Sequence, residues 1–140
     1  MTNTIKWTIR ACDSKDADVL LDFWRQAETT PSVTDTLDDV QRMIKAATVL
    51  VAEADGKLVG SILGVFDGWR ANIYRLAVQS AYRRRGIAAA LVGEVEKRLV
   101  QQGAKKFSAI VEADHSWVTS FWEALGYAAE HWTIRYTLTV

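Results

Sequence analysis

Two Asp-Gly pairs constrain the fold most strongly, because each stands where one run of strand-forming residues gives way to the next. Asp55-Gly56 separates Thr48–Ala54 from Lys57–Phe66, and both runs are rich in apolar and β-branched residues. Asp-Gly is a strong hairpin signal, since both residues of such a turn need positive φ. Asp67-Gly68 marks a second turn before the run Ile73–Val78. The middle of the chain is therefore predicted to be an antiparallel meander of three strands.

The spacing of apolar residues predicts the elements on either side of this meander. Before it lie a strand at Trp7–Ala11, a helix capped by Ser14 or Asp16, and a helix from about Thr36 to Ala46. After it come an amphipathic helix that begins near Ile87 and ends at Gly103, a strand at Phe107–Val111, a helix at Ser116–Leu125 and a strand at Trp132–Val140. The predicted fold class is α/β (α+β), with about four helices on one mixed sheet, in the order β-α-α-β-β-β-α-β-α-β.

Length and composition limit the kind of protein. A chain of 140 residues fits a single domain, 1–140, and buries a sizeable core without disulfides or a structural metal, so no metal site is expected. Cys12 is the only cysteine, which excludes an intramolecular disulfide and favours a cytoplasmic location. Residues 1–6 lack the apolar stretch of a signal peptide, and no apolar run approaches the ~18 residues of a membrane span. The 17 basic and 17 acidic residues give zero formal net charge, which argues against a general nucleic-acid or membrane binder.

The segment Leu76–Ala88 carries the chemistry. A strand runs into three arginines, Arg83–Arg85, then into Gly86 and immediately into a helix. The free N–H groups and the dipole of a helix's first turn bind anions. Gly86 lets a phosphate approach the backbone, and the arginines add charge-assisted donors. The predicted ligand is a diphosphate. No Gly-Lys-Ser or Gly-Lys-Thr follows, so the loop is not of the Walker type.

This segment resembles the first signature of the GNAT superfamily of N-acetyltransferases, Arg/Gln-x-x-Gly-x-Gly/Ala, which Arg83-x-x-Gly86-x-Ala88 matches. The stretch Phe121–Tyr127 resembles the family's second signature, an aromatic pair before a Leu-Gly-aromatic. The stretch Val59–Arg70 is also similar to a small bacterial subgroup, the YpeA-like acetyltransferases. The resemblance implies a mostly antiparallel sheet of six to seven strands whose central strands splay apart, with a cleft between Tyr74–Val78 and Phe107–Val111.

The resemblance also implies acetyl-CoA as the co-substrate. Backbone groups near Ala77 and Val78 would pair with the pantetheine arm, and an N–H near Val78 would donate to the thioester oxygen as an oxyanion donor. Backbone amides from Arg84 to Ala88 would hold the diphosphate. The residues expected to bind the cofactor are Leu76, Ala77, Val78, Arg83, Arg84, Arg85, Gly86, Ile87, Ala88, His115 and Trp122.

The general acid departs from the family's pattern. Trp122 stands where many members have a tyrosine, and an indole N–H does not give up a proton at useful pH. Either the thiol, with a pKa near ~8.5, leaves unassisted as a thiolate, or the hydroxyl of Tyr74 or Tyr127 protonates it. His115 stands where asparagine is frequent, and it is either a cofactor contact or a surface histidine at a helix start.

The general base and the acceptor site are open as well. Candidate bases are Glu112, Asp114, Glu53 and Asp67, and ordered waters are an alternative to all four. Trp69, beside Arg70 in a polar turn, is the best candidate for contact with the substrate, with a dimer contact as the other interpretation.

The predicted function is transfer of the acetyl group of acetyl-CoA to a primary amine by direct nucleophilic attack. This route needs no acyl-enzyme, so Cys12 is expected to be a buried small residue and not a nucleophile. The alternatives are a CoA-binding or acyl-CoA-binding sensor without turnover, and a nucleic-acid patch at the three arginines, which zero net charge disfavours. The expected partner is a small-molecule or peptide amine, with no nucleic acid and no membrane, and the stretch 132–140 leaves a homodimer open.

Overall fold

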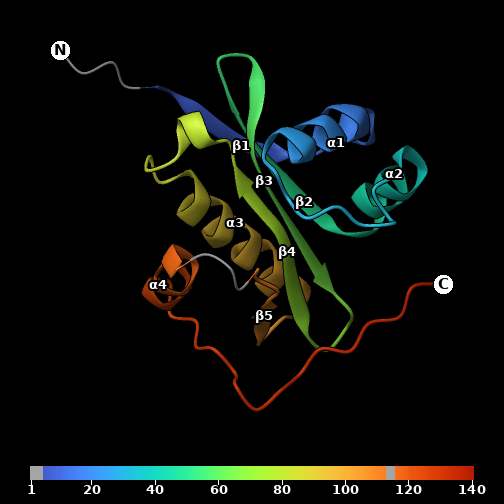
Figure 1. Ribbon diagram of the computed structural model, residues 1–140, viewed down its shortest axis with the longest axis vertical. Coiled ribbons are helices and arrows are strands. Elements are labelled where there is room, and N and C mark those ends of the chain that lie inside the picture. The colour runs from blue at the N-terminus through green and yellow to red at the C-terminus, as the bar shows by residue number, and fades with distance from the viewer. Residues whose placement is uncertain (1–4, 113–115) are drawn as a thin grey trace. The chain divides into compact units, whose positions relative to one another are not determined.

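Residues 5–112 and 116–140 are described in the computed structural model (Figure 1). They fall into two compact units, residues 1–109 and 110–140. The first unit holds a five-stranded sheet and three α-helices, and the second holds one α-helix. No helix in these described ranges is long and apolar enough to cross a membrane.

The sheet of the first unit confirms the predicted meander. The strands lie in the order β1-β2-β3-β4-β5, and every neighbouring pair is antiparallel except β4 and β5, which are parallel. The meander consists of β2, β3 and β4. The elements in chain order are β1 (Trp7–Ala11), the 3-10 helix η1 (Ser14–Asp16), α1 (Ala17–Gln26), α2 (Leu37–Ala46), β2 (Thr48–Ala54), β3 (Lys57–Phe66), β4 (Ala71–Val78), the 3-10 helix η2 (Ser80–Tyr82), α3 (Ile87–Gln102) and β5 (Phe107–Ala109).

Local signals in the sequence explain where several of these elements begin and end. Asp55 and Gly56 have φ values of 53° and 74° and connect β2 to β3, as the Asp-Gly pair predicts. Thr36 caps α2, because its hydroxyl accepts the backbone N–H of Asp39 at 3.2 Å. Gly103 ends α3 in the left-handed conformation, with φ of 115°.

Of the two predicted caps of the first helix, Ser14 is wrong, and Asp16 stands at the N-cap of α1 but forms no side-chain cap hydrogen bond there. Asp13 caps η1, since its carboxylate accepts the N–H of Lys15 at 3.0 Å while the Asp16 carboxylate accepts the N–H of Asp13 at 2.9 Å. These reciprocal bonds form a capping box, which satisfies two N–H groups where a single cap would satisfy one. Helix α1 then continues directly from η1, with no side-chain cap at its own start.

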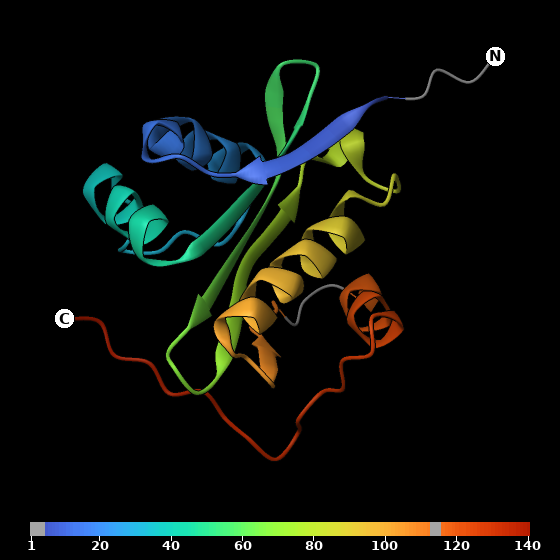
Figure 2. The ribbon, with the colours of Figure 1, turned by 180° about the vertical axis from the view of Figure 1, so that it is seen from behind.

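Alternating side chains along the strands place helices on both faces of the sheet (Figure 1, Figure 2). On one face, Val51 and Leu63 join a buried cluster with residues of α1 and α2. On the other face, α3 lies over Gly60 and Gly64 of β3, where a Cβ on Gly64 would stand only 2.7 Å from Cγ2 of Val95. The two glycines therefore allow the close approach of α3 to the sheet.

The second unit contains α4 (Ser116–Ala124), which confirms the predicted helix. Gly126 follows it with φ of 92°, as expected of a glycine that closes a helix. The half-buried ring of Trp122 packs edge-on against Phe121 and Tyr127, with ring centroids 5.4 and 4.9 Å apart. The second aromatic signature therefore forms the packed part of this unit.

The predicted terminal strand at Trp132–Val140 is wrong. These residues form no strand, and their apolar side chains are exposed, for example 77% at Trp132 and 88% at Leu138. A strand needs the N–H and C=O groups of a neighbouring strand, and the described residues of 110–140 contain no other strand. The strand predicted at Phe107–Val111 also ends early, at Ala109. The described chain thus has five strands, and both the expected six to seven and the final β of the expected order are wrong.

Candidate active site

Strand β4 has one paired edge and one open edge. Its antiparallel neighbour β3 accompanies it from Ala71 to Val78. Its parallel neighbour β5 pairs with it only from Ala71 to Ile73. Residues 74–78 therefore have no strand on that side within the five-stranded sheet. This open edge is the β4 side of the predicted cleft.

The backbone of Val78 faces the open edge. In an antiparallel pair, the N–H and C=O groups of successive residues point alternately to the two edges of a strand. Gln79 donates its N–H to the C=O of Val59 on β3 at 2.8 Å, so the N–H and C=O of Val78 point away from β3. The C=O of Val78 accepts the Nε–H of Arg83 at 3.1 Å. The N–H of Val78 is thus directed at any ligand that lies along the open edge.

A β-bulge sets the direction of this stretch. Between the pairs Ser61↔Ala77 and Leu63↔Tyr74, β4 contains one residue more than β3. Arg75 lies in this bulge with φ of 53°, in the left-handed region that residues other than glycine rarely adopt. The bulge separates the start of β4, which pairs with β5, from the open stretch that ends at Val78.

The loop between β4 and α3 is fixed in a shape that suits an anion. The hydroxyl of buried Tyr82 donates to the carboxylate of Asp55 at 2.8 Å, which ties η2 to the β2–β3 turn. Arg84 and Gly86 have φ values of 63° and 82°. A backbone that changes hand at neighbouring residues turns its N–H groups toward a common point, as in known anion-binding loops.

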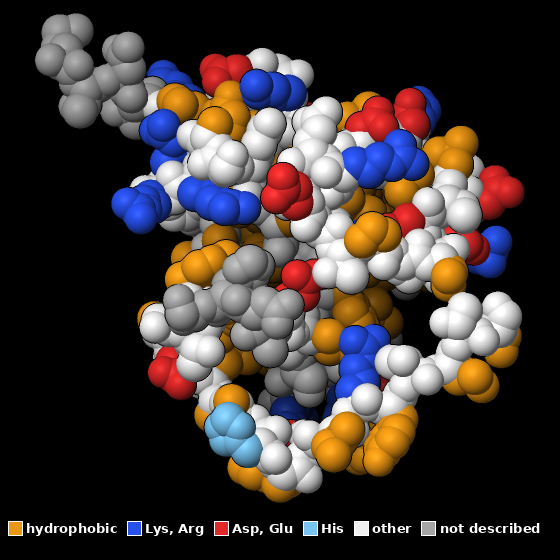
Figure 3. All heavy atoms as spheres, viewed as in Figure 1, with side chains coloured by type: hydrophobic (Ala, Val, Ile, Leu, Met, Phe, Trp, Pro, Cys, Tyr) orange, Lys and Arg blue, Asp and Glu red, His pale blue; other side chains and the backbone are white. Residues whose placement is uncertain are grey.

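The N-terminus of α3 presents N–H groups to the same loop. Gly86 is the N-cap and provides no side-chain cap, and the bond from the N–H of Ala90 to the C=O of Gly86 at 3.1 Å lies one turn into the helix. A Cβ on Gly86 would meet no atom within 4 Å, so the space before it is open. Arg84 and Arg85 are exposed, and Figure 3 shows Lys and Arg side chains gathered around this region. Charge and geometry together favour an anionic ligand.

Most of the residues predicted to bind the cofactor lie on this continuous path. Leu76–Val78 lie on the open edge, and Arg84–Ala88 form the loop and the first turn of α3. The side chain of Arg83 differs from the expectation, because its Nε–H holds the carbonyl of Val78. Tyr74 is half-buried and packs against the apolar cluster beneath α1 and α2. These residues lie together in one region, and the contact of Arg83 with Val78 was not predicted.

Trp69 and Arg70 lie away from this loop, in the turn between β3 and β4. Trp69 is 74% exposed, and the Arg70 guanidinium stacks over its ring at 4.4 Å. They line a hollow of about 460 Å³ with Gly103, at the C-terminal end of α3. Helix α3 has 16 residues, so its ends are about 24 Å apart. The structure therefore does not bring these two residues together with the anion loop.

The remaining candidate residues belong to the second unit or lie outside the described residues. Glu112 is exposed, and Trp122 is half-buried between Phe121 and Tyr127. His115 and the alternative base Asp114 lie outside the described residues. Across residues 5–112 and 116–140, no group of three or more His, Cys, Asp or Glu side chains could hold a metal ion.

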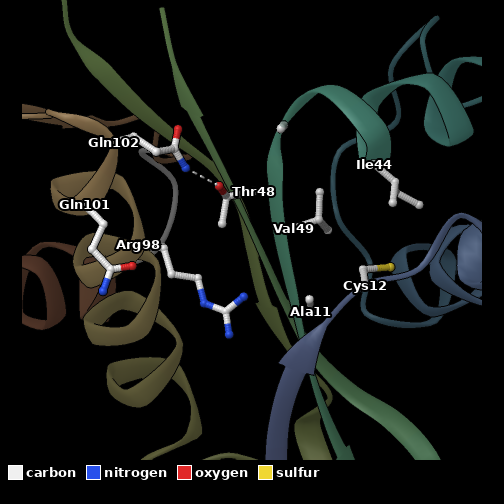
Figure 4. A pocket seen from close by; sticks show the side chains of 9 residues that line it. Ala11, Cys12, Ile44, Thr48, Val49, Arg98, Gln101 and Gln102 are labelled. Atoms are coloured by element: carbon white, nitrogen blue, oxygen red, sulfur yellow. Dashed lines mark hydrogen bonds between the residues drawn. The ribbon is translucent and has the colours of Figure 1, made fainter. Parts of the chain in front are cut away.

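Cys12 lines a separate hollow of about 400 Å³, between the end of β1, the end of α2 and helix α3 (Figure 4). Its thiol points toward the helices α1 and α2, against whose apolar cluster it packs, and away from Arg98. Burial, assisted by the negative charge of Asp16, raises the pKa of the Cys12 thiol to about 12. A thiol with such a pKa is a poor nucleophile near neutral pH. Cys12 was expected to be buried, and it is half-buried.

Sequence reasoning missed the residues that fix the bulge. Ser61 is 1% exposed, and its hydroxyl donates to the C=O of Arg75 at 2.9 Å. A signal was present in the burial pattern expected of β4. Ile73 and Val78 are both buried and both lie on the face of α3, opposite Gly64 and Gly60, yet they stand an odd number of positions apart, with four residues between them. In a regular strand such residues face opposite sides, so their spacing requires a bulge.

A strand edge that offers backbone donors and leads into a basic loop at a helix N-terminus suits an extended, phosphate-bearing ligand. The chain belongs to the acetyltransferase (GNAT) family, whose profile matches residues 17–127. This membership confirms the predicted class of enzyme, an N-acetyltransferase and acyltransferase that uses acetyl-CoA as its co-substrate.

Solved structures of acetyltransferases share the fold. The aminoglycoside N-acetyltransferase AAC(6')-Iy, in complex with CoA, has a TM-score of 0.80 at 16% identity, covering 100% of this chain and 99% of its own. The PaiA N-acetyltransferase of Thermoplasma acidophilum, in complex with coenzyme A, has a TM-score of 0.79 at 20% identity, covering 89% and 91%. A ribosomal-protein-alanine N-acetyltransferase from Brucella melitensis biovar Abortus 2308 has a TM-score of 0.73 at 20% identity, covering 96% and 100%.

Proposed function

We propose that the chain transfers the acetyl group of acetyl-CoA to a primary amine by direct attack at the open edge of β4. The observation that carries this proposal is the continuity of one strand edge, with its Val78 N–H, and the anion loop before α3. The amine nitrogen bonds to the thioester carbon, the C–S bond breaks, and CoA leaves with the electron pair. The extra proton of the amine passes to a base.

The backbone supplies most of the binding groups in this proposal. Leu76–Val78 hold the pantetheine arm as an added strand, and residues 84–88 hold the diphosphate. The N–H of Val78 donates to the thioester oxygen as it gains negative charge. Loss of one preorganised donor of this kind typically lowers kcat by about 10²–10³. Arg83 supports the edge by its hydrogen bond to the carbonyl of Val78.

In this proposal, the reaction needs no dedicated general acid, and its general base is a carboxylate or an ordered water. A thiol with a pKa near ~8.5 leaves as a thiolate without a dedicated acid. The hydroxyl of Tyr74 is the second choice, since Tyr74 lies on β4 just before the bulge. Glu112 is the proposed base, with an ordered water as its alternative. His115 and Trp122 remain proposed cofactor contacts.

The proposed acceptor is a small-molecule amine. The aminoglycoside acetyltransferases AAC(6')-Iy and meta-AAC0020 have similar folds, and the second was solved with sisomicin, which favours small polyamines of this class as first candidates. A ribosomal-protein-alanine N-acetyltransferase of similar fold makes a peptide N-terminus the second class to test. Trp69 and Arg70 are the proposed contacts for a larger acceptor, because they lie exposed beside a hollow.

The test is release of free CoA thiol from acetyl-CoA in the presence of sisomicin, spermidine or an alanine-ended peptide, against acetyl-CoA hydrolysis without amine. Turnover of any amine with formation of its N-acetyl product supports the proposal. The alternative is a CoA-binding sensor, for which Trp122, at the position of the usual acid, and the lack of an evident base in the sequence are the arguments. Tight CoA binding without acetylation of any amine class would favour the sensor.

At the level of the whole chain, we propose that residues 1–140 work as one acetyltransferase domain in the cytoplasm. The family match supports a single functional domain, since residues 17–127 span the boundary between the two compact units. We further propose that the chain is of the YpeA-like subgroup, on the strength of the stretch Val59–Arg70. We propose no nucleic-acid or membrane partner, in keeping with zero net charge.

A homodimer is proposed through the C-terminal stretch. Its exposed apolar residues alternate with polar ones, so in an extended chain they would share one side: Trp132, Ile134, Tyr136, Leu138 and Val140. Two copies of such a stretch pair antiparallel around a two-fold axis, which covers these side chains. Leu138→Asp is expected to turn a dimer into a monomer in sedimentation analysis, with Thr137→Asp as the control. A wild-type monomer at all concentrations would exclude the dimer.

A further inference from the structure

We infer that Arg75 is a positioning residue of the transfer site. It connects the segment between α1 and α2 to the β-bulge that sets the direction of the Val78 N–H. The inference rests on the proposed function, because Val78 matters only if its N–H meets the thioester. Its parts are one strained backbone position, a buried hydrogen-bond relay and a tethered guanidinium. All of them lie in the first unit.

The backbone of Arg75 is held from beneath the sheet. The Nε1–H of Trp24 on α1 donates to the Ser61 hydroxyl at 3.0 Å, and that hydroxyl donates to the C=O of Arg75 at 2.9 Å. Trp24 and Ser61 are 4% and 1% exposed. A buried relay with both donors and acceptors satisfied fixes its members in one arrangement. It therefore holds Arg75 at its φ of 53°, which the residue would otherwise rarely adopt.

The side chain of Arg75 ends in a different segment. Its guanidinium forms an ion pair with the carboxylate of Asp35 at 2.8 Å and donates to the hydroxyl of Thr29 at 3.3 Å. It also stacks over the ring of Trp24, 4.4 Å from the centroid. The side chains of Arg75 and Asp35 are only 17% and 21% exposed, so this pair is less screened than a surface pair. One residue thus joins the bulge, α1 and the segment that precedes α2.

The bulge controls which way Val78 points. A strand that loses or gains one residue in its register exchanges its two faces and its two edges. If Arg75 relaxed to an ordinary strand conformation and the bulge disappeared, the N–H of Val78 would turn toward β3. Ser61, Trp24 and Arg75 therefore position the proposed oxyanion donor, although none of them touches the thioester.

Separate variants test the buried hydrogen bonds and the guanidinium of Arg75. Ser61→Ala removes the anchor of the Arg75 carbonyl, and Trp24→Phe removes the indole N–H but keeps a ring. Arg75→Gly removes the guanidinium at a position whose φ suits glycine, so this variant is expected to fold. Arg25→Gln is the matched control, since Arg25 also lies on α1 and forms an exposed ion pair with Asp22. Thermal unfolding shows which variants are folded.

The experiment follows two backbone amides of isotope-labelled protein by NMR during titration with CoA and then with acetyl-CoA. In the wild type, the Gly86 amide is expected to shift with both ligands, and the Val78 amide to shift further with acetyl-CoA. In Arg75→Gly and Ser61→Ala, the Gly86 response and the CoA affinity are expected to stay within about twofold. The extra Val78 response is expected to be lost, and kcat to fall by about tenfold or more. A merely structural role would weaken CoA binding and kcat together.

The outcomes distinguish the two claims. A wild-type Gly86 amide that ignores both ligands would overturn the proposed cofactor site, and the inference with it. A normal Gly86 response, with the Val78 response and kcat of the variants equal to those of Arg25→Gln, would overturn the inference alone.

Discussion

Single residues of the site depend on backbone conformations that few side chains tolerate. Gly86 stands at φ of 82° with open space in front of it, so it combines a left-handed conformation with access to the first turn of α3. Arg84 and Arg75 adopt positive φ without being glycine. Such conformations carry a cost, and surrounding hydrogen bonds maintain them. At Arg75, the Ser61 hydroxyl donates to the backbone C=O, and the Nε1–H of Trp24 donates to that hydroxyl.

Gly86→Glu tests the anion loop, with Gly86→Ala as the matched control. Both substitutions place an L residue at positive φ, which costs roughly 1–2 kcal/mol of stability. Only the glutamate adds a negative charge where the diphosphate is proposed to bind. The Kd for CoA is expected to rise more than about 100-fold in Gly86→Glu, equivalent to about 3 kcal/mol, and clearly less in Gly86→Ala. Equal affinities in both variants would show that the loop does not hold the diphosphate.

Cys12 gives a prediction on pH. Burial raises its thiol pKa to about 12, whereas in the unfolded chain the thiol ionises near ~8.5. The folded state keeps a proton that the unfolded state releases, so this contribution to stability is present below ~8.5 and is lost as pH rises toward 12. Urea unfolding from pH 7 to 10 is expected to show a steeper loss of stability in the wild type than in Cys12→Ala. Identical pH profiles would contradict the raised pKa.

For single residues, the sequence predicts the roles of glycines and charged side chains better than it predicts which residues adopt a strained backbone conformation. Gly86 and the arginines around it are readable because glycine before a helix and clustered positive charge each have a direct physical meaning. Arg75 is not, because its left-handed φ is imposed by Ser61 and Trp24, which lie 14 and 51 positions away along the chain. The redirection of Arg83 to the carbonyl of Val78 likewise depends on the loop's three-dimensional course.

Among the elements, β3 and α3 approach each other closely at Gly64. A Cβ added to Gly64 would lie 2.7 Å from Cγ2 of Val95 and 2.8 Å from Cδ1 of Leu99. Gly93, by contrast, lies exposed on α3 with nothing within 4 Å of its Cβ position. The two glycines thus have opposite roles, one enabling packing and the other only weakening a helix.

Gly64→Ala and Gly93→Ala form a matched pair that tests this contact. Gly64→Ala is expected to lower the free energy of unfolding by roughly 1–3 kcal/mol, because α3 must move away from β3. Gly93→Ala is expected to raise it by roughly 0.5–1 kcal/mol, because alanine favours a helix interior more than glycine. Urea denaturation measures both. A neutral Gly64→Ala would mean that α3 is not packed closely on β3.

Trp122 gives a prediction for the second aromatic signature. Its ring packs against Phe121 and Tyr127, so Trp122→Ala is expected to lower the free energy of unfolding. Truncation of a fully buried tryptophan costs about 3–5 kcal/mol. Truncation of the half-buried Trp122 is expected to cost less than that. Turnover per folded molecule is expected to change less. A variant that stays folded and binds CoA but loses turnover would instead assign chemistry to the indole.

Elements with local signals were predicted well, and those that need a distant partner were not. The Asp-Gly turn between β2 and β3 and the glycine after α3 each act within a few residues, and both agree with the structure. The alternating stretch Trp132–Val140 has the composition of a strand. Composition shows that a strand is favourable, but not which N–H and C=O groups would pair with it.

At the scale of the whole molecule, the chain matches one family profile and carries one proposed binding path. Residues 17–127 match the acetyltransferase (GNAT) family, and the path from Val78 to Ala88 contains the family's first signature. Zero net charge leaves a local cluster, Arg83–Arg85, as the electrostatic feature of this path. The identity of the acceptor amine is not readable from the sequence, because fold and cofactor site do not define the second substrate.

The most direct test of the account is calorimetric titration of the full chain with acetyl-CoA, with CoA and ATP as comparisons. The account predicts binding of acetyl-CoA and CoA with Kd values in the micromolar range, about −8 kcal/mol, because both carry the pantetheine arm and the diphosphate. ATP has phosphates but no pantetheine arm, so it is expected to bind much more weakly. No binding of acetyl-CoA, or equal binding of all three, would contradict a site built from the β4 edge and the loop before α3.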